Sequence, residues 1–189
     1  MTRTMQRLMF WIVLIVTGMT VCAAPSYAST VISAGNMVVN TGQTFNLNVS
    51  ISGVTDLFSW QFDLSFDHTL LTANSISEGP FLKTGGSTNY VAGTIDNSAG
   101  TIKNTADTLT GFTGVSGSGV LAFVNFTAGS TTGISAIILS NITLLDSNFN
   151  AIVNTPQNGS VTIVAAPEPS TLFLFSAVVL LGLLRKARS

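Results

Sequence analysis

Few side chains in this 189-residue sequence could carry out chemistry. His68 is the single histidine and Cys22 the single cysteine. A Ser-His-Asp triad would have to use His68, but this residue directly follows Phe66 and Asp67 at the end of an alternating run, which is typical of a turn. Zinc sites normally need several His or Cys ligands. We therefore expect no catalytic residue, no metal and no cofactor.

Carboxylates could in principle form a glycosidase pair, in which two acids flank the scissile bond. Asp63 and Asp67 are four residues apart on a predicted strand, so their side chains share a face about 13 Å apart. That distance is wider than either glycosidase geometry. Asp96 and Asn97 leave calcium as a minor alternative, because oxygen clusters suit hard cations. The acids are interpreted as solvated strand and turn residues, and an enzyme is not expected.

Charge is scarce and lies mainly at the two ends of the chain. Only 8% of residues are Asp, Glu, Lys or Arg, against about 25% in soluble domains. Between residues 29 and 166 the two lysines, Lys83 and Lys103, stand against seven acids, a formal charge of −5. Nucleic-acid affinity depends on neutralising phosphates with basic side chains, so this stretch predicts no nucleic-acid partner.

The first 28 residues have the pattern of a secretory signal peptide. Arg3 and Arg7 form the charged region, residues 8–16 the apolar region, and small residues precede a cleavage site after Ala28. An uncleaved anchor helix is the alternative, although the apolar run is short for a membrane span. We expect a protein that is exported through the inner membrane.

The last residues, 165–189, resemble the PEP-CTERM sorting signal of Gram-negative bacteria. Its three parts follow one another in order: the motif Pro167, Glu168 and Pro169, an apolar helix over 171–184, and the basic residues Arg185, Lys186 and Arg188. Basic residues hold such a helix in the membrane with that end in the cytoplasm. The resemblance implies recognition by an exosortase and delivery to the cell surface or exopolysaccharide matrix after transient anchoring. A plain C-terminal anchor is the alternative.

Between the two ends the hydrophobic period is two, which is typical of half-buried strands. Five large side chains alternate with polar ones over residues 58–66, and similar sets occupy 45–51 and 120–126. Shorter strands are predicted at 30–34, 70–76, 90–95, 101–104, 134–139, 142–145 and 160–164. With no helical period, about nine short strands indicate an all-β, two-sheet sandwich over residues 29–164.

Within this domain the sequence also resembles cohesin domains. The resemblance rests on Gly53-Val54-Thr55-Asp56-Leu57-Phe58-Ser59-Trp60-Gln61-Phe62-Asp63-Leu64-Ser65-Phe66-Asp67-His68-Thr69-Leu70-Leu71, on Glu78-Gly79-Pro80-Phe81-Leu82, on residues 114–121 and on Asn158-Gly159-Ser160-Val161. It implies a nine-stranded jelly roll, related in fold to carbohydrate-binding modules, that holds dockerin-bearing proteins.

The resemblance also implies where a partner would bind. In cohesins the binding surface is a sheet face that includes polar residues of the strand corresponding to residues 58–66. In this sequence that face would comprise Ser59, Gln61, Asp63 and Ser65. Dockerin-binding cohesins often carry Asn and Asp where this chain has Ser59 and Gln61, so a charge-assisted hydrogen bond is lost here.

Two functions from different classes follow. The first is a non-catalytic module that binds a protein, dockerin-like or otherwise, through a sheet face in scaffold or adhesion contacts. The alternative is direct binding of exopolysaccharide, linked to polysaccharide metabolism. Glycan binding usually requires exposed aromatic rings. Trp60 is predicted to be core and Tyr90 to be the better exposed ring.

Overall fold

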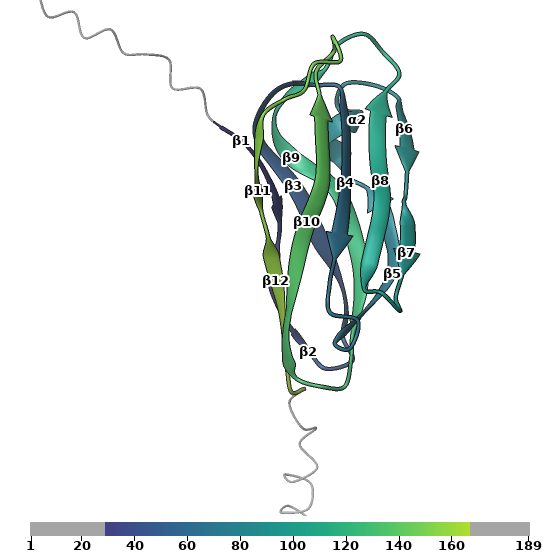
Figure 1. Ribbon diagram of the computed structural model, residues 1–189, viewed down its shortest axis with the longest axis vertical. Coiled ribbons are helices and arrows are strands. Elements are labelled where there is room, and N and C mark those ends of the chain that lie inside the picture. The colour runs from purple at the N-terminus through teal and green to yellow at the C-terminus, as the bar shows by residue number, and fades with distance from the viewer. Residues whose placement is uncertain (1–28, 167–189) are drawn as a thin grey trace, which may run out of the picture.

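Two β-sheets packed face to face make up residues 29–166, which are the residues that the computed structural model describes (Figure 1). The signal peptide and its cleavage site at Ala28, the sorting motif 167–169 and the basic cluster 185–188 lie outside these residues. None of the described residues forms a helix long and apolar enough to cross a membrane. The all-β sandwich expected from the period-two pattern is confirmed.

The first sheet has five strands in the order β11-β1-β3-β9-β5. In chain order these are β1 (Thr30–Ala34), β3 (Thr44–Leu57), β5 (Leu71–Glu78), β9 (Val115–Ala128) and β11 (Asn154–Gln157).

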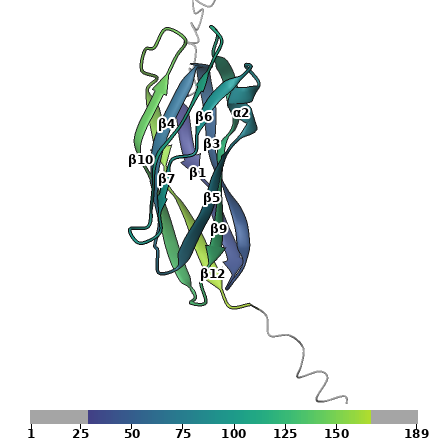
Figure 2. The ribbon, with the colours of Figure 1, turned by 90° about the vertical axis from the view of Figure 1, so that its right-hand side faces the viewer.

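The second sheet has seven strands in the order β2-β12-β10-β4-β8-β6, with β7 also paired to β8. They are β2 (Asn36–Asn40), β4 (Ser59–Ser65), β6 (Thr88–Val91), β7 (Thr94–Asp96), β8 (Thr101–Leu109), β10 (Gly133–Leu145) and β12 (Gly159–Val164). Figure 2 shows the two layers from the side, with β10 and β4 in one and β9 in the other.

The core forms where the apolar sides of β4 and of the β3–β9 pair meet. All five large residues predicted for the apolar side of the 58–66 run are buried, and Trp60 is among them, so its assignment to the core is confirmed. Phe126 of β9 stacks on Phe45 at 5.9 Å and meets Phe66 edge-on at 5.1 Å. Burying side chains of this size contributes about 1.5–3 kcal/mol each, so these rows hold the sheets together.

Two chain segments cross from one sheet to the other, and they do so side by side. β1 belongs to the first sheet and β2 to the second, with Gly35 between them. Likewise β11 pairs with β1, and β12 pairs with β2 and β10, with Asn158 between β11 and β12. The Asn158 side chain accepts the Leu139 N–H at 3.0 Å. The sheets are therefore joined along this edge by continuous chain.

The strand count differs from the expected nine because three segments are interrupted. β1/β2 and β11/β12 each change sheet, and β6/β7 are separate stretches on the same neighbour, β8. Joined across these breaks, the twelve strands make nine continuous segments. The separate strands expected at 134–139 and 142–145 are one strand, β10, whose irregularity is Asn141 in the left-handed region at φ 49°.

A single helical turn, α2 (Pro80–Lys83), was not predicted. Proline at its start pre-sets the helical φ, and its buried Phe81 and Leu82 join the core. It lies beside β9 and near the β5 and β6 edges of the two sheets.

The sheet-crossing edge generates a prediction at Gly159. A Cβ built there would lie 2.2 Å from the Gly35 carbonyl oxygen and 2.7 Å from that of Ala34. Backbone cannot give way as a flexible side chain can, so Gly159→Ala should lower the free energy of unfolding by about 1–3 kcal/mol. Gly111→Ala is the matched control, because a Cβ at Gly111 meets nothing within 4 Å. Equal urea midpoints for the two variants would contradict this account.

Candidate functional site

The four residues predicted for the partner-binding face lie together on one side of β4. Ser59, Gln61, Asp63 and Ser65 alternate with buried residues and are each partly exposed. β4 is an interior strand between β10 and β8. The outward side chains of β4 therefore occupy the middle of the second sheet's outer face. Their role in binding stays a prediction.

Asp63 links the two strands that flank β4. Its carboxylate accepts the Asn104 backbone N–H of β8 at 2.7 Å and the Asn141 side-chain N–H of β10 at 2.6 Å. Both asparagines are in the left-handed region, at φ 59° and 49°, where the register of each strand shifts. Asn tolerates this conformation better than most residues. Asp63 thus stabilises two β-bulges, and its charge is committed within the sheet.

Ser59 is also engaged within the sheet, through its hydroxyl at 2.7 Å from the Thr108 hydroxyl. Gln61 and Ser65, in contrast, make no side-chain hydrogen bond with any other described residue. Of the four predicted residues, these two leave their polar groups available to a partner.

Aliphatic side chains that the sequence reasoning missed flank this polar centre. Ile138 of β10 lies opposite Ser65 and is 44% exposed. Farther out, Ile134 and Val38 lie on either side of Thr162 in one cross-strand row, and Val91 is exposed on β6. The signal was in residues 134–139, where apolar residues occupy both alternating positions. A strand with one side exposed to solvent does not need apolar residues on that side, so their presence there indicated an apolar surface.

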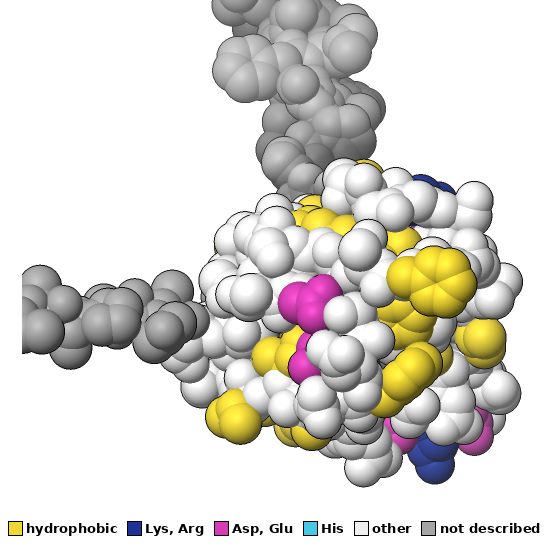
Figure 3. Space-filling view, turned by 90° about the horizontal axis from the view of Figure 1, so that it is seen from above, with side chains coloured by type: hydrophobic (Ala, Val, Ile, Leu, Met, Phe, Trp, Pro, Cys, Tyr) yellow, Lys and Arg dark blue, Asp and Glu magenta, His cyan; other side chains and the backbone are white. Residues whose placement is uncertain are grey.

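Aromatic side chains are exposed at the end of the sandwich where β8 and β10 finish. Phe112, in the β8–β9 loop, is 96% exposed and Phe149, in the β10–β11 loop, is 68% exposed. Figure 3, which looks down on this end, shows hydrophobic side chains at the surface. The prediction that Tyr90 is an exposed ring is wrong. Its hydroxyl is buried and its ring lies 6.3 Å from that of Trp60, because β6 turns this side chain inward.

Buried polar groups gather under the outer face, along one cross-strand row. Trp60, Asp107 and Tyr90 face one another on β4, β8 and β6. Asp107 is 1% exposed, and its Oδ1 accepts the Thr108 N–H at 2.9 Å. Its Oδ2 has no hydrogen-bond partner among the described residues, nor do Trp60 Nε1 and Tyr90 OH.

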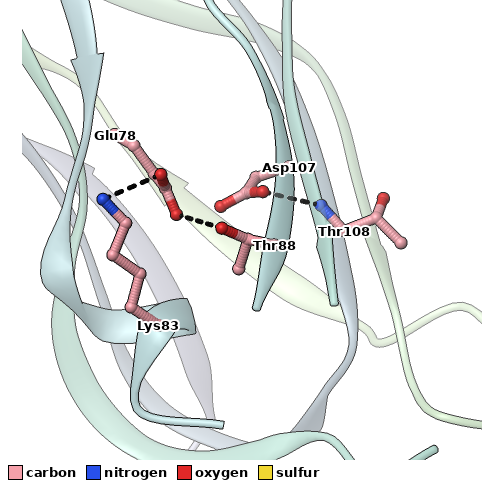
Figure 4. Close-up of polar contacts among 5 residues, drawn as sticks. All are labelled: Glu78, Lys83, Thr88, Asp107 and Thr108. Atoms are coloured by element: carbon pink, nitrogen blue, oxygen red, sulfur yellow. Dashed lines mark hydrogen bonds and ion pairs between the residues drawn. The ribbon is translucent and has the colours of Figure 1, made fainter. Parts of the chain in front are cut away.

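Glu78 approaches this row from the other sheet (Figure 4). It accepts the Thr88 hydroxyl at 2.6 Å and pairs with Lys83 of α2 at 2.9 Å. Burial, and then the Glu78 charge, raise the pKa of Asp107 to about 7. Burial also opposes ionisation of Glu78, but the hydrogen bonds from Thr88 and Lys83 outweigh it and lower the pKa of that carboxyl. A neutral Asp107 carboxyl facing an ionised Glu78 suits this enclosed space.

The hydrogen bond and ion pair of Glu78 in this cluster join β5, β6 and α2. We therefore assign it to closing the sheet edge opposite the crossing strands. His68 lies exposed in the turn after β4, as expected. The Asp96 carboxylate accepts the Ser98 and Ala99 N–H groups, and Asn97 bonds the backbone of Ala73. Within residues 29–166, no three or more His, Cys, Asp or Glu side chains are grouped so that they could hold a metal ion.

The Asp107–Glu78 pair generates a pH prediction. Because the folded state keeps a proton on Asp107 that the unfolded chain releases above 3.8, the free energy of unfolding should fall as pH rises from about 4 to about 7. Asp107→Asn has no such proton, and its amide can donate to Glu78. Its stability should fall less across this window, with a difference on the order of 1–3 kcal/mol.

Urea unfolding of both proteins between pH 4 and 8 measures this difference. Asp146→Asn is the control, because hydrogen bonds from Asn150 and Asn148 lower the pKa of Asp146. The contribution of the Asp146 carboxyl to the free energy of unfolding changes at lower pH. The profile of Asp146→Asn should therefore parallel that of the wild type above pH 5. A parallel profile for Asp107→Asn as well would count against the protonated carboxyl.

Solved structures resemble this sandwich over nearly their whole length. A non-cellulosomal cohesin from the hyperthermophilic archaeon Archaeoglobus fulgidus is 22% identical, with 73% of this chain and 93% of that chain covered and a TM-score of 0.62. The sixth cohesin of the Acetivibrio cellulolyticus scaffoldin B, solved with a Cel5 dockerin, is 21% identical, with 72% and 100% covered and a TM-score of 0.61. At these identities the likeness establishes the fold.

A type I cohesin–dockerin complex from Clostridium thermocellum gives the same picture, at 20% identity, with 72% of this chain and 100% of that chain covered and a TM-score of 0.61. No curated protein matches the sequence. The family model of the cohesin domain matches residues 30–163, from the start of β1 almost to the end of β12. The expectation of a non-catalytic binding module is thereby confirmed, and the chain belongs to the cohesin domain family.

Proposed function

We propose that this protein binds a dockerin-like protein through the outer face of β10, β4 and β8. The observation that carries the proposal is the composition of that face: polar side chains available on Gln61 and Ser65, with exposed aliphatics beside them. Two of the cohesins to which the chain is similar were solved with dockerins. Protein–protein interfaces combine apolar and polar contacts.

The partner should be recognised mainly by shape and apolar contact. Asp63, the acid on β4, is already bonded to Asn104 and Asn141. Without a free carboxylate at the centre of the face, strong charge-assisted hydrogen bonds to a partner are missing. Ile138, adjacent to Ser65 across the β4–β10 pair, is the side chain we expect to contribute most.

Ile138→Glu should weaken the association about tenfold or more, because a charge would be buried within the contact, beside Ser65. The measurement is calorimetric titration with a dockerin-bearing protein identified by mass spectrometry after pull-down from the matching secretome. Asn48→Glu is the matched control, since Asn48 is exposed on β3 in the other sheet. Equal affinities for the two variants would exclude this face, and recovery of no partner would contradict protein binding.

We further propose that the two ends of the chain deliver this domain to the cell surface or exopolysaccharide matrix. The support is the order of segments: an export signal through Ala28, the domain, then Pro167-Glu168-Pro169 with an apolar stretch and a basic end. An exosortase would cut at the motif after transient anchoring in the inner membrane. The basic cluster at Arg185, Lys186 and Arg188 would hold the orientation.

Glu168→Ala should leave the uncut form in the membrane fraction, because the motif would no longer be recognised. Ser170→Ala, just after the motif, is the control and should be processed normally. Immunoblots of membrane and extracellular fractions, with intact masses, distinguish the two. A wild-type protein that keeps its tail in the membrane would instead support the plain anchor.

A further inference from the structure

The loops that bear Phe112 and Phe149 are held together by one carboxylate. Asp56, at the end of β3, accepts the Gly114 N–H at 2.9 Å from the first loop and the Ser147 hydroxyl at 2.6 Å from the second. Hydrogen bonding by Ser147 lowers the pKa of this carboxyl, which keeps it ionised. A Cβ at position 114 would lie 2.5 Å from Asp56 Oδ1, so glycine permits this close approach.

Phe149 is held in an unfavourable conformation while its ring stays exposed. Its φ is 62°, in the left-handed region, which is unfavourable for a bulky residue and is often found where function requires it. The ring packs edge-on against Phe58 at 5.4 Å. Asp146 accepts the Asn148 and Asn150 N–H groups at 2.8 Å each, which closes the loop around it. The ring is therefore fixed in place before any ligand arrives.

The exposed side chains next to both rings are uncharged amides and hydroxyls, which can form hydrogen bonds. Thr113 follows Phe112, and Asn148 and Asn150 flank Phe149, all with exposed side chains. Neither loop contains Lys or Arg. The acid of the Phe149 loop, Asp146, accepts hydrogen bonds from Asn148 and Asn150 of the same loop. A membrane-binding surface would need basic residues to attract anionic lipid. Aromatic faces with amides and hydroxyls suit a ligand that has both C–H faces and hydroxyl groups.

We propose that this end of the domain binds a neutral polysaccharide. Phe112 and Phe149 stack on sugar rings, and Thr113 and Asn148 bond sugar hydroxyls. Rigid aromatic rings supply contact area with little loss of conformational entropy. The described chain ends after β12, at the opposite end of the sandwich (Figure 1). This site is separate from the β10-β4-β8 face, so protein and glycan could be held together.

The test is affinity electrophoresis in native gels that contain β-glucan, xylan or mannan. We expect retardation of the wild type in at least one gel, and about tenfold weaker binding for Phe112→Ala. Phe112→Tyr keeps an aromatic face and should bind like the wild type. Phe112→Leu keeps apolar area without the ring and should behave like Phe112→Ala. Because Phe112 is 96% exposed, none of these changes should affect folding, which thermal unfolding checks.

Val164→Ala is the matched control for loss of exposed apolar area outside the loops, because Val164 is 39% exposed at the end of β12. It should leave retardation unchanged. Unaltered migration of the wild type in all three gels would overturn the proposal, as would a Phe112→Leu variant that binds as well as wild type. Cosedimentation with phosphatidylcholine vesicles, or self-association in ultracentrifugation, that Phe112→Ala abolishes would also overturn it, in favour of a membrane or a second copy.

Discussion

The backbone contact between the two crossing segments is the constraint on which the rest of the sandwich depends. Gly159 lies against the carbonyl oxygens of Ala34 and Gly35, so two strands can change sheet at the same level. Along this edge, the outermost strand of each sheet, β11 or β2, is continuous in the chain with a strand of the other sheet, β12 or β1. The opposite edge has no shared strand, and there α2 with the Glu78, Lys83 and Asp107 side chains lies between the sheets. Both edges are thus closed, and most side chains buried between the sheets are apolar.

On the outer face of the second sheet, two of the polar residues of β4 are used within the sheet itself. Asp63 holds a bulge on each neighbouring strand, and Ser59 bonds Thr108. These hydrogen bonds stiffen the face, so little ordering entropy would be lost on binding a partner there. Aspartate side chains act as braces elsewhere too, since Asp56 joins two loops in the same way. In a chain without disulfides in this domain, these acids position the loops.

Sequence patterns predicted the main strands well and their interruptions poorly. The 58–66 run was unambiguous, because only a half-buried strand explains five large residues at alternate positions. β2 and β11 were missed because each is short and its pairing depends on the chain crossing between sheets. The exposed ring was placed at Tyr90 instead of Phe112 and Phe149. Hydropathy does not say which side of an edge strand is buried.

The sequence by itself determined which chemistry is absent and which sheet-forming pattern is present. One turn histidine, no cysteine in the domain and a strict alternation are local properties that no packing can change. Tertiary structure decided what each polar or aromatic group does. Asp56 meets Gly114 and Ser147, which are 58 and 91 positions away along the chain. Burial between the sheets, and then the charge of a glutamate in the other sheet, raise the pKa of Asp107. Such effects arise only when strands distant in sequence are brought together, because burial and hydrogen bonding act over a few ångströms.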